Sequence, residues 1–320
     1  MSLNYQDVYE AYNRIKGYVQ KTPLEESFYL GDGARKYFFK LESLQRAKSF
    51  KIRGALNKMM TLTDEEKERG VASVSSGNHG SSVSYAASLL GIKNAKIIVP
   101  ETTPQSKVDK IEYFGGEAVR MGKGYDEAHA LGMELIEHEG LTYIDAYDTD
   151  PLIYAGQGTI AIEIHEQNPA IDTIVVPIGG GGLITGIAVA AKAIKPDIRI
   201  VGVQTEACPS MIASYQDGVF YGEYEGSPSI CDALVGGVGH LSYEIAKDYV
   251  DTFLTVTEES IKKAVSFMAK EEKYVVEAGS CTTVAAIQSH REEVGGENIA
   301  LVLSGANIDG ALLAEILCSN

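Results

Sequence analysis

The sequence predicts an α/β protein with two lobes, each built on an open parallel β-sheet. From residue 71 onward, short apolar runs alternate with amphipathic stretches, and this alternation is typical of parallel strands covered by helices. The chain has 320 residues, 45% hydrophobic and 22% charged, which is ordinary for one or two globular domains. The turn-like stretch YDTDP interrupts the alternation. Because a single sheet rarely holds so many strands, we place a lobe boundary near residues 148–151.

The first lobe is predicted from apolar runs that alternate with helical patterns. The predicted strands are residues 71–76, 95–100, 117–121 and 141–145, and the predicted helices are residues 79–90, 103–114 and 125–139. Each helix is followed by a glycine, at Gly91, Gly115 and Gly140. Glycine readily adopts the left-handed conformation that ends many helices, so these positions are predicted to be C-terminal caps.

The second lobe repeats the alternation after residue 151. Its predicted strands are residues 172–178, 199–205, 251–256 and 298–305, and its predicted helices are residues 152–167, 183–194, 258–272 and 281–293. Residues 206–245, which are rich in Gly, Ser, Pro and Tyr, are expected to be irregular.

Composition and charge exclude several functional classes. The formal net charge of -16 would repel a nucleic-acid backbone. Residues 1–17 are polar and interrupted by charge, and no later stretch reaches the length of about 18 apolar residues that a membrane span requires. The four cysteines are widely spaced and form no C-x-x-C pair. We therefore expect a cytoplasmic protein that binds neither nucleic acid nor membrane, with reduced cysteines in its core.

Lys51 begins a predicted helix, and a cation at a helix N-terminus is disfavoured by about 0.3–1 kcal/mol. The helical period comes from apolar residues, and Ser49 is the predicted N-cap; the apolar residues are Ile52, Ala55, Leu56, Met59 and Met60. Further positive charge stands nearby, at Arg46, Lys48, Arg53 and Lys58. Clustered like charge and partial burial would lower the pKa of Lys51, as a nucleophilic amine requires. The alternative is an ordinary lysine that extends from an amphipathic helix.

Three loops directly after predicted strands are candidate ligand sites, because ligands of parallel sheets bind beyond the carboxyl ends of the strands. The first, SSGNHG at 75–80, gathers polar side chains at a helix start and could hold a carboxylate. A glycine turn with capping residues is the alternative. The second, Gly179 to Gly182, lets backbone N–H groups converge on a phosphate, although a flexible loop is also possible. The third loop, within residues 301–309, contains Ser304 and Asn307 directly after an apolar strand.

An activated lysine, a carboxylate site, a phosphate site and a strand-end hydroxyl together describe a site for pyridoxal phosphate and an amino acid. Over nearly its whole length, the chain resembles the fold-type II pyridoxal-phosphate enzymes, in particular the threonine/serine dehydratase and serine racemase family. The motifs in family order are SFKIRGA, SSGNHG, AGQGT, GGGGLITG and SGANID. The resemblance implies a fold like that of the tryptophan synthase β subunit, with the cofactor between two open parallel-sheet domains. Residues 1–50 and 149–320 would form the large domain and 51–148 the small one.

The resemblance also implies a role for each motif residue. Lys51 matches the Schiff-base lysine, Phe50 packs near the ring, and Asn78 hydrogen-bonds the ring hydroxyl. Gly179, Gly180, Gly181 and Gly182 match the phosphate loop, and Ser304 matches the partner of the pyridine nitrogen. The substrate carboxylate would be received by Ser75, Ser76, Gly77, Asn78 and His79. Ser76 also matches the second acid/base of the racemases.

The implied reaction is dehydration and deamination of a β-hydroxy amino acid, most simply L-threonine or L-serine. The alternatives are a serine racemase, a dehydratase for 3-hydroxyaspartate or phenylserine, and a catalytically silent ligand-binding homologue. The motifs depart from the family at Ser81, at 144–148 and at 276–280, so the accepted side chain stays open. Gln204 and Ser210 replace the acidic ligands of the racemases' divalent cation, and no metal is expected there. A homo-oligomer without a regulatory domain is also implied.

Overall fold

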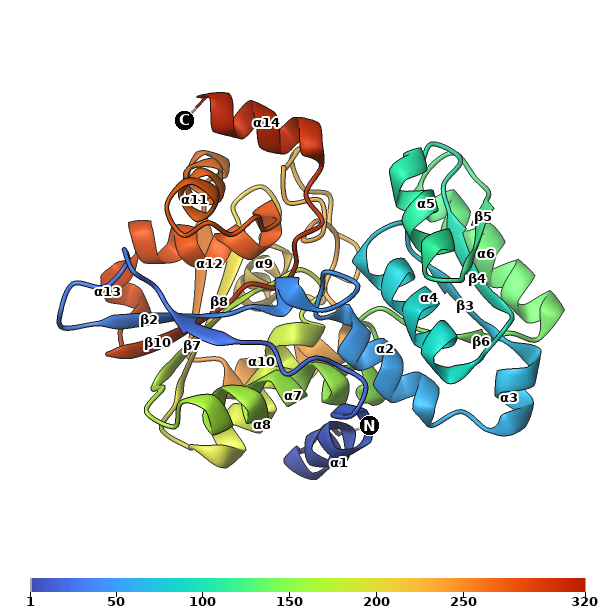
Figure 1. Ribbon diagram of the computed structural model, residues 1–320, viewed down its shortest axis with the longest axis horizontal. Helices are drawn as coiled ribbons and strands as arrows, with labels where there is room; N and C mark the ends of the chain where they lie inside the picture. The colour runs from blue at the N-terminus through green and yellow to red at the C-terminus, as the bar shows by residue number, and fades with distance from the viewer. Residues whose placement is uncertain (1, 320) are drawn as a thin grey trace.

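The computed structural model describes residues 2–319 as two lobes, each with its own β-sheet (Figure 1). The larger sheet has six strands in the order β1-β2-β10-β7-β8-β9, and the smaller has four in the order β5-β4-β3-β6. The fold is therefore the predicted α/β class with two open sheets. All strand pairs are parallel except β1 with β2 at the edge of the larger sheet.

Helices cover both faces of the larger sheet, which is why its central strands are almost wholly buried. Its strands are β1 (Leu24–Glu26), β2 (Lys36–Lys40), β7 (Thr173–Pro177), β8 (Arg199–Thr205), β9 (Thr252–Val256) and β10 (Asn298–Val302). One face carries α1 (Tyr5–Ile15), α7 (Pro151–Gln167), α8 (Gly182–Ile194) and α10 (His240–Tyr249). The other carries α11 (Glu258–Lys270), α12 (Ala278–Ser289), α13 (Arg291–Val294) and α14 (Gly310–Ser319).

The smaller sheet is also covered on both sides. Its strands are β3 (Val71–Val74), β4 (Ala95–Val99), β5 (Glu117–Arg120) and β6 (Thr142–Tyr143). Its lobe contains helices α3 (Asp64–Arg69), α4 (Asn78–Leu90), α5 (Gln105–Tyr113) and α6 (Tyr125–Glu139). Gly91 and Gly140 are left-handed C-caps of α4 and α6, and Gly115 has φ 90° two residues beyond α5. The predicted glycine caps are confirmed at Gly91 and Gly140, whereas the cap of α5 is Phe114 and Gly115 follows it.

Helix α2 (Lys51–Met60) packs against both α4 and α7 and so connects the two lobes. Its N-cap position is Phe50, which has helical φ and ψ and no side-chain cap. The prediction of Ser49 as N-cap is therefore wrong by one residue, although Ser49 Oγ still accepts a hydrogen bond from Lys51 N at 3.4 Å. Since α2 contacts both lobes, its packing does not assign it to one of them. The domain limits at residues 50/51 and 148/149 therefore stay a prediction.

Several elements differ from the sequence-based expectation. The stretch 206–245 contains α9 (Ser210–Asp217) and the start of α10. The helix expected at 281–293 begins at Ala278 and breaks at His290, whose φ of -132° and ψ of 35° end the helical path. Helix α1 and strands β1 and β2 were not predicted. The two strands are short, and β2 pairs with β10 from a remote part of the chain. Three further elements were also not predicted, namely the 3₁₀ turn η1 (Glu42–Leu44), α3 and α14.

Within residues 2–319, no helix is both long and apolar enough to span a membrane. Three free cysteines, Cys208, Cys231 and Cys281, are buried as expected of small core residues. Cys318 is exposed on α14, so the expectation of a core position is wrong for this cysteine.

Candidate active site

Lys51 is the first residue of α2 and lies between the two lobes. Its Nζ donates a hydrogen bond to Ala146 O at 3.0 Å and lies 5.4 Å and 5.5 Å from the ring centres of Phe50 and Tyr147. Burial lowers the pKa of Lys51 to about 8, against the opposing effect of the Asp145 and Glu277 carboxylates. A minor but appreciable fraction of the amine is therefore unprotonated near neutral pH and available as a nucleophile or base.

Of the two predicted causes of this pKa shift, burial is confirmed and clustered positive charge is wrong. Clustered positive charge was expected to lower the pKa of Lys51, but the charges that act on it are carboxylates, which raise it. The nearby cations are paired elsewhere: Arg53 with buried carboxylates and Lys58 with Asp150 at 2.7 Å. Loss of hydration alone accounts for the lowered value.

The strand-end loop that carries Ser304 adjoins the Lys51 segment directly. Ser304 O accepts a hydrogen bond from Phe50 N at 3.0 Å. The Ser304 hydroxyl is buried, 3.0 Å from the Ser280 hydroxyl of α12. Ser280 Oγ also bonds both the N–H and the C=O of Gly305, at 2.8 Å and 2.9 Å. These contacts fix Ser304 firmly at the end of β10.

The glycine loop between β7 and α8 has the donors that a phosphate requires. Among residues 2–319, no group accepts a hydrogen bond from the N–H groups of Gly179, Gly180 or Gly181, and the 13-residue helix α8 begins directly after them. Gly181 has φ 91°, and a Cβ at Gly180 would lie 2.1 Å from the Tyr147 ring, so neither position tolerates a side chain. Thr185 Oγ1, in the first turns of α8, is buried without a partner in the described chain. This donor set fits a phosphate group.

The SSGNHG segment forms the turn from β3 into α4. Ser75 Oγ accepts a hydrogen bond from Gly77 N at 3.3 Å, whereas the Ser76 hydroxyl has no partner among residues 2–319. The N–H groups of Asn78 and His79, at the start of α4, also have no acceptor there. The His79 ring is buried and contacts Ile144 O through Nε2 at 3.0 Å, and burial lowers its pKa to about 4. His79 is thus neutral, and this turn offers a carboxylate two backbone N–H groups and the Ser76 hydroxyl.

Glu277 is a residue of this region that sequence reasoning missed. Both of its carboxylate oxygens accept hydrogen bonds from Asn78 Nδ2, at 3.1 Å and 3.0 Å, and Asn307 N donates to it at 3.2 Å. Burial raises the pKa of Glu277 to about 6, against the lowering effect of the Asn78 bond. The sequence contained a signal, because Glu277 lies in the segment 276–280 that departs from the family motif.

Tyr147 and Asp145 belong to the second departing segment, 144–148, and also lie at Lys51. The Tyr147 ring covers Gly180. Asp145 accepts hydrogen bonds from three successive backbone N–H groups, those of residues 147–149, at 3.3, 2.7 and 3.0 Å. These bonds hold the turn whose Ala146 carbonyl receives the Lys51 amine.

Gln204 and Ser210, which the resemblance matches to cation ligands of the racemases, are neutral and hydrogen-bonded within the protein. Gln204 Oε1 accepts hydrogen bonds from the N–H groups of Met211 and Ile212, each at 3.1 Å, and Gln204 Nε2 lies 3.5 Å from Ser210 Oγ. In residues 2–319, no group of three or more His, Cys, Asp or Glu side chains is arranged to hold a metal ion.

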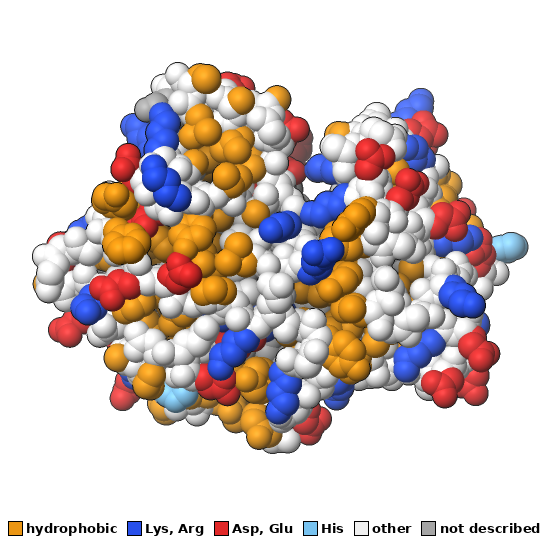
Figure 2. Space-filling model, viewed as in Figure 1, with side chains coloured by type: hydrophobic (Ala, Val, Ile, Leu, Met, Phe, Trp, Pro, Cys, Tyr) orange, Lys and Arg blue, Asp and Glu red, His pale blue; other side chains and the backbone are white. Residues whose placement is uncertain are grey.

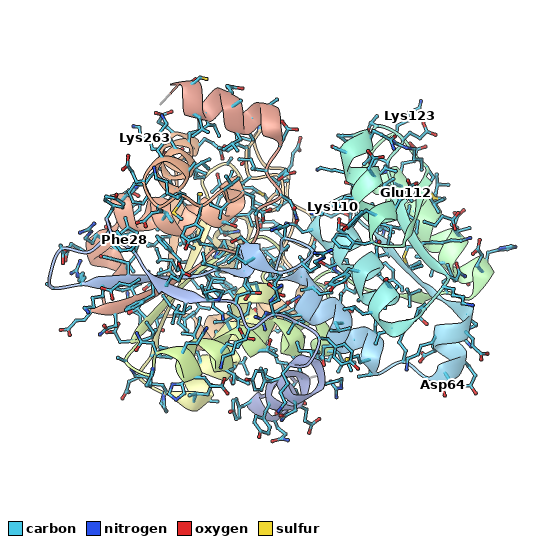
Figure 3. The ribbon with its side chains drawn as sticks, in the orientation of Figure 1. Phe28, Asp64, Lys110, Glu112, Lys123 and Lys263 are labelled. Atoms are coloured by element: carbon cyan, nitrogen blue, oxygen red, sulfur yellow. The ribbon has the colours of Figure 1, made fainter. Side chains whose placement is uncertain are left out.

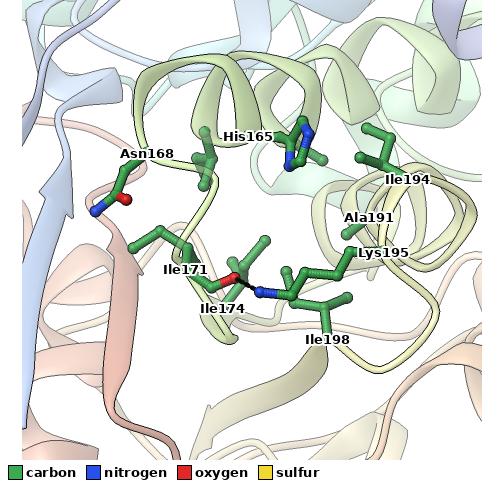
Figure 4. A pocket seen from close by; sticks show the side chains of 10 residues that line it. His165, Asn168, Ile171, Ile174, Ala191, Ile194, Lys195 and Ile198 are labelled. Atoms are coloured by element: carbon green, nitrogen blue, oxygen red, sulfur yellow. Dashed lines mark hydrogen bonds between the residues drawn. The ribbon is translucent and has the colours of Figure 1, made fainter.

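A separate cavity lies between α7 and α8, away from these loops (Figure 4). It is lined mainly by isoleucines, and Lys195 Nζ closes one side by donating to Ile171 O at 2.7 Å. Its volume of about 10 Å³ corresponds to roughly one water molecule. It contains none of the predicted site residues.

Two comparisons at the sequence level agree with this geometry. The family profile described as "Pyridoxal-phosphate dependent enzyme" matches residues 15–305. The catabolic L-threonine dehydratase TdcB of Escherichia coli is 38% identical over 314 residues, which is 97% of this chain and 94% of that protein. The L-threonine ammonia-lyase of Thermotoga maritima is 39% identical over 98% of this chain and 77% of its own length.

The structure of maize serine racemase superposes with a TM-score of 0.91 at 33% identity, covering 100% of this chain and 98% of that one. The free N–H groups of the glycine loop and the low pKa of Lys51 fit the phosphate and the aldehyde of the family's cofactor. Sequence, fold and site therefore lead to one conclusion: the chain belongs to the pyridoxal-phosphate dependent enzyme family.

Proposed function

We propose that this protein is an L-threonine ammonia-lyase that also accepts L-serine. Threonine would lose its β-hydroxyl as water and its amino group as ammonia, which gives 2-oxobutanoate, and serine would give pyruvate. The relatives named as threonine ammonia-lyase and threonine dehydratase support this substrate class. The observation that carries the proposal is the amine of Lys51, with its pKa of about 8, beside the glycine loop and the turn into α4.

The roles proposed for the site residues rest on the resemblance to the family, and the free donors and the lowered pKa of Lys51 support them. Lys51 would hold the cofactor covalently, and its amine, when free, would take the proton from the substrate Cα. The backbone N–H groups of the glycine loop would bind the phosphate, and the Asn78 side chain would donate to the ring hydroxyl. The backbone N–H groups of Asn78 and His79 would bind the substrate carboxylate. Ser304 would be the neutral partner of the ring nitrogen. When bound, pyridoxal phosphate supplies the electron-withdrawing system that makes the Cα proton acidic.

Charge at the site favours a substrate with a neutral side chain. The charged groups that act on Lys51 are the carboxylates of Asp145 and Glu277. A second carboxylate on the substrate, as in 3-hydroxyaspartate, would face these anions and would be costly to bury without a cation. Threonine and serine bring only a hydroxyl, which needs no counter-ion.

The substrate proposal predicts the order of kcat/KM across four β-hydroxy amino acids. We expect threonine and serine to exceed 3-hydroxyaspartate and phenylserine when 2-oxo acid release is measured. If both fall more than about a hundredfold below another member of the set, a gap of about 2.7 kcal/mol in transition-state binding, the substrate is wrong while the reaction class stands.

Serine racemase activity is the second candidate, because the Ser76 hydroxyl has no partner in residues 2–319 and occupies the position of the racemases' second acid/base. Chiral chromatography of serine after incubation with the enzyme tests it. Ser76→Ala should abolish any D-serine formed and leave Cα proton removal from L-threonine within about threefold. Equal loss of both reactions would mean that Ser76 has no role specific to racemisation.

Replacing Ser304 by aspartate is expected to reduce elimination about tenfold or more, equal to about 1.4 kcal/mol of barrier. A carboxylate opposite the ring nitrogen would keep that nitrogen protonated and alter the electron sink, whereas a hydroxyl does not. Ser304→Asp should retain cofactor, as absorbance and phosphate analysis would show. Ser304→Ala is the control for loss of the hydroxyl alone. Unchanged turnover in Ser304→Asp would refute the role.

A cytoplasmic location and a homo-oligomeric state are further parts of this proposal. They rest on resemblance to the family. Light scattering coupled to size exclusion measures the oligomeric state directly.

A further inference from the structure

Helix α5 of the smaller lobe contacts the larger lobe through one face. Lys107 Nζ lies 3.3 Å from Asp232, Lys110 Nζ donates to Ala47 O at 3.2 Å, and the Tyr113 hydroxyl accepts from Arg46 at 3.2 Å. These three α5 residues are spaced by three positions and therefore share a face of the helix. Lys and Arg side chains gather at the notch between the lobes in Figure 2. In Figure 3, Lys110 points toward the larger lobe and Glu112 away from it.

Lys110 is the middle contact of this face, and it begins a chain of hydrogen bonds into the active site. Its ammonium donates to the side-chain oxygen of Asn307, in the loop after β10. Asn307 Nδ2 in turn donates to the side-chain oxygen of Asn78. Asn78 Nδ2 then donates to both oxygens of Glu277, at 3.1 Å and 3.0 Å. Four side chains from four separate segments thus form one continuous path.

The charges of Lys110 and Glu277, at the two ends of this path, determine which group donates and which accepts in each hydrogen bond. An ammonium can only donate, so Asn307 must present its oxygen to Lys110 and its amide hydrogens to Asn78. A carboxylate can only accept, so Asn78 must present its hydrogens to Glu277. Neither amide can rotate by 180° without placing two donors or two acceptors against each other. Without Lys110, only the Glu277 end would still be specified by charge.

We propose that Lys110 is a positioning residue, which acts through Asn307 to hold the Asn78 amide in the orientation that the cofactor ring meets. The orientation of the Asn78 amide then depends on the contact that Lys110 makes between the lobes. The inference rests on the proposed function in one respect, namely that Asn78 faces the cofactor. Lys110 itself touches none of the reacting atoms.

The charged groups that act on Lys110 are Glu277, from the start of α12, and Lys48, from the loop before α2. Burial lowers the pKa of Lys110 to about 8, with Glu277 opposing the shift and Lys48 adding to it. The amine is therefore a charged, donor-only group below pH 8 and loses that property above it. Because the pKa of Glu277 is about 6, its carboxylate becomes protonated, and so able to donate, below that pH. The orientations of Asn307 and Asn78 should therefore be best defined between about pH 6 and pH 8, where Glu277 only accepts and Lys110 only donates.

The test compares Lys110→Met with Lys110→Arg and with Lys107→Met in the holoenzyme. Lys107→Met is the matched control, because it removes a contact between the lobes from the same face of α5 but is not connected to Asn78. The measurements are the pH dependence of the bound cofactor's visible absorption and its dissociation constant. We expect Lys110→Met to weaken cofactor binding about tenfold and to raise the pH midpoint of the absorption change. Lys110→Arg should restore both values to within about threefold, and Lys107→Met should change neither by more than about twofold.

A double-mutant cycle separates action through Asn307 from a direct effect of charge. In an Asn307→Ala background, Lys110→Met should cause less than a twofold further change in the dissociation constant. An undiminished effect there, an unaltered spectrum in Lys110→Met, or an equal effect of Lys107→Met would overturn the inference. No substrate is needed for these measurements. A wild-type enzyme that fails to convert threonine or serine would therefore refute the proposed function without affecting this result.

Discussion

Lys51→Ala is expected to lower turnover of threonine by at least about a thousandfold, because in the proposed mechanism one amine both holds the cofactor and takes the Cα proton. Borohydride treatment of the wild-type holoenzyme should leave a pyridoxyl group on the peptide that contains Lys51, and the variant should carry none. The amine suits this role because burial brings its pKa to about 8. Peptide mapping by mass spectrometry and initial-rate measurements check the two parts separately.

Lys58→Ala is the matched control for Lys51. Lys58 lies on the same helix, two turns later, and pairs with Asp150 at 2.7 Å. Its removal should leave turnover within about twofold and labelling at Lys51 intact. A pyridoxyl group on any other lysine would contradict the assignment of Lys51, whatever the activity of the variants.

The largest effect on stability is expected from Arg53→Met, because Arg53 is the centre of a buried ion cluster. Its guanidinium donates to Glu42 through Nε, at 2.8 Å, and to Glu163 through two nitrogens, at 2.7 Å and 2.8 Å. Lys40 Nζ donates to Glu163 at 2.6 Å. Burial by itself would raise the pKa of Glu42, but the guanidinium charge outweighs it and holds that pKa below its usual value. Two cations and two anions thus balance inside the protein.

Removal of Arg53 would leave two buried carboxylates facing a single lysine. Breaking a buried pair in this way typically costs about 3–5 kcal/mol, and we expect Arg53→Met to lower the free energy of unfolding by about that amount in urea. Arg35→Met is the control, because Arg35 donates two similar bonds to Glu292 at the surface, where about 1 kcal/mol or less is expected. A loss below about 1 kcal/mol for Arg53→Met would show that the cluster does not stabilise the fold.

The same cluster explains how the Lys51 segment is held in place. Arg53 is on α2, Glu42 follows β2, and Glu163 is on α7, so their bonds tie the first turn of α2 to the larger lobe. Arg53 stands two residues from Lys51. The sequence marked Arg53 only as one of several nearby cations, and its pairing became visible when the three elements were placed together.

Local sequence was sufficient for most of the architecture and for the chemistry of the loops. The eight predicted strands correspond to β3–β10, and β3, β4, β7, β8 and β10 among them are mainly apolar runs that are almost wholly buried. The Lys51 helix and the glycine loop were likewise recognisable, because a glycine-rich turn between a strand and a helix has few other uses. Strands β1 and β2 escaped prediction, because β2 is placed by its pairing with β10, more than 250 residues later.

The sequence by itself determined which segments carry chemistry, since each is a short strand–turn–helix unit with its polar groups adjacent along the chain. The tertiary structure alone decided how those groups are held. Asn78 meets Glu277 across 199 residues and Lys110 meets Asn307 across 197, and no local pattern specifies such pairs. It also decided the pKa of Lys51, because burial, and not neighbouring positive charge, removes the hydration that would keep the amine protonated.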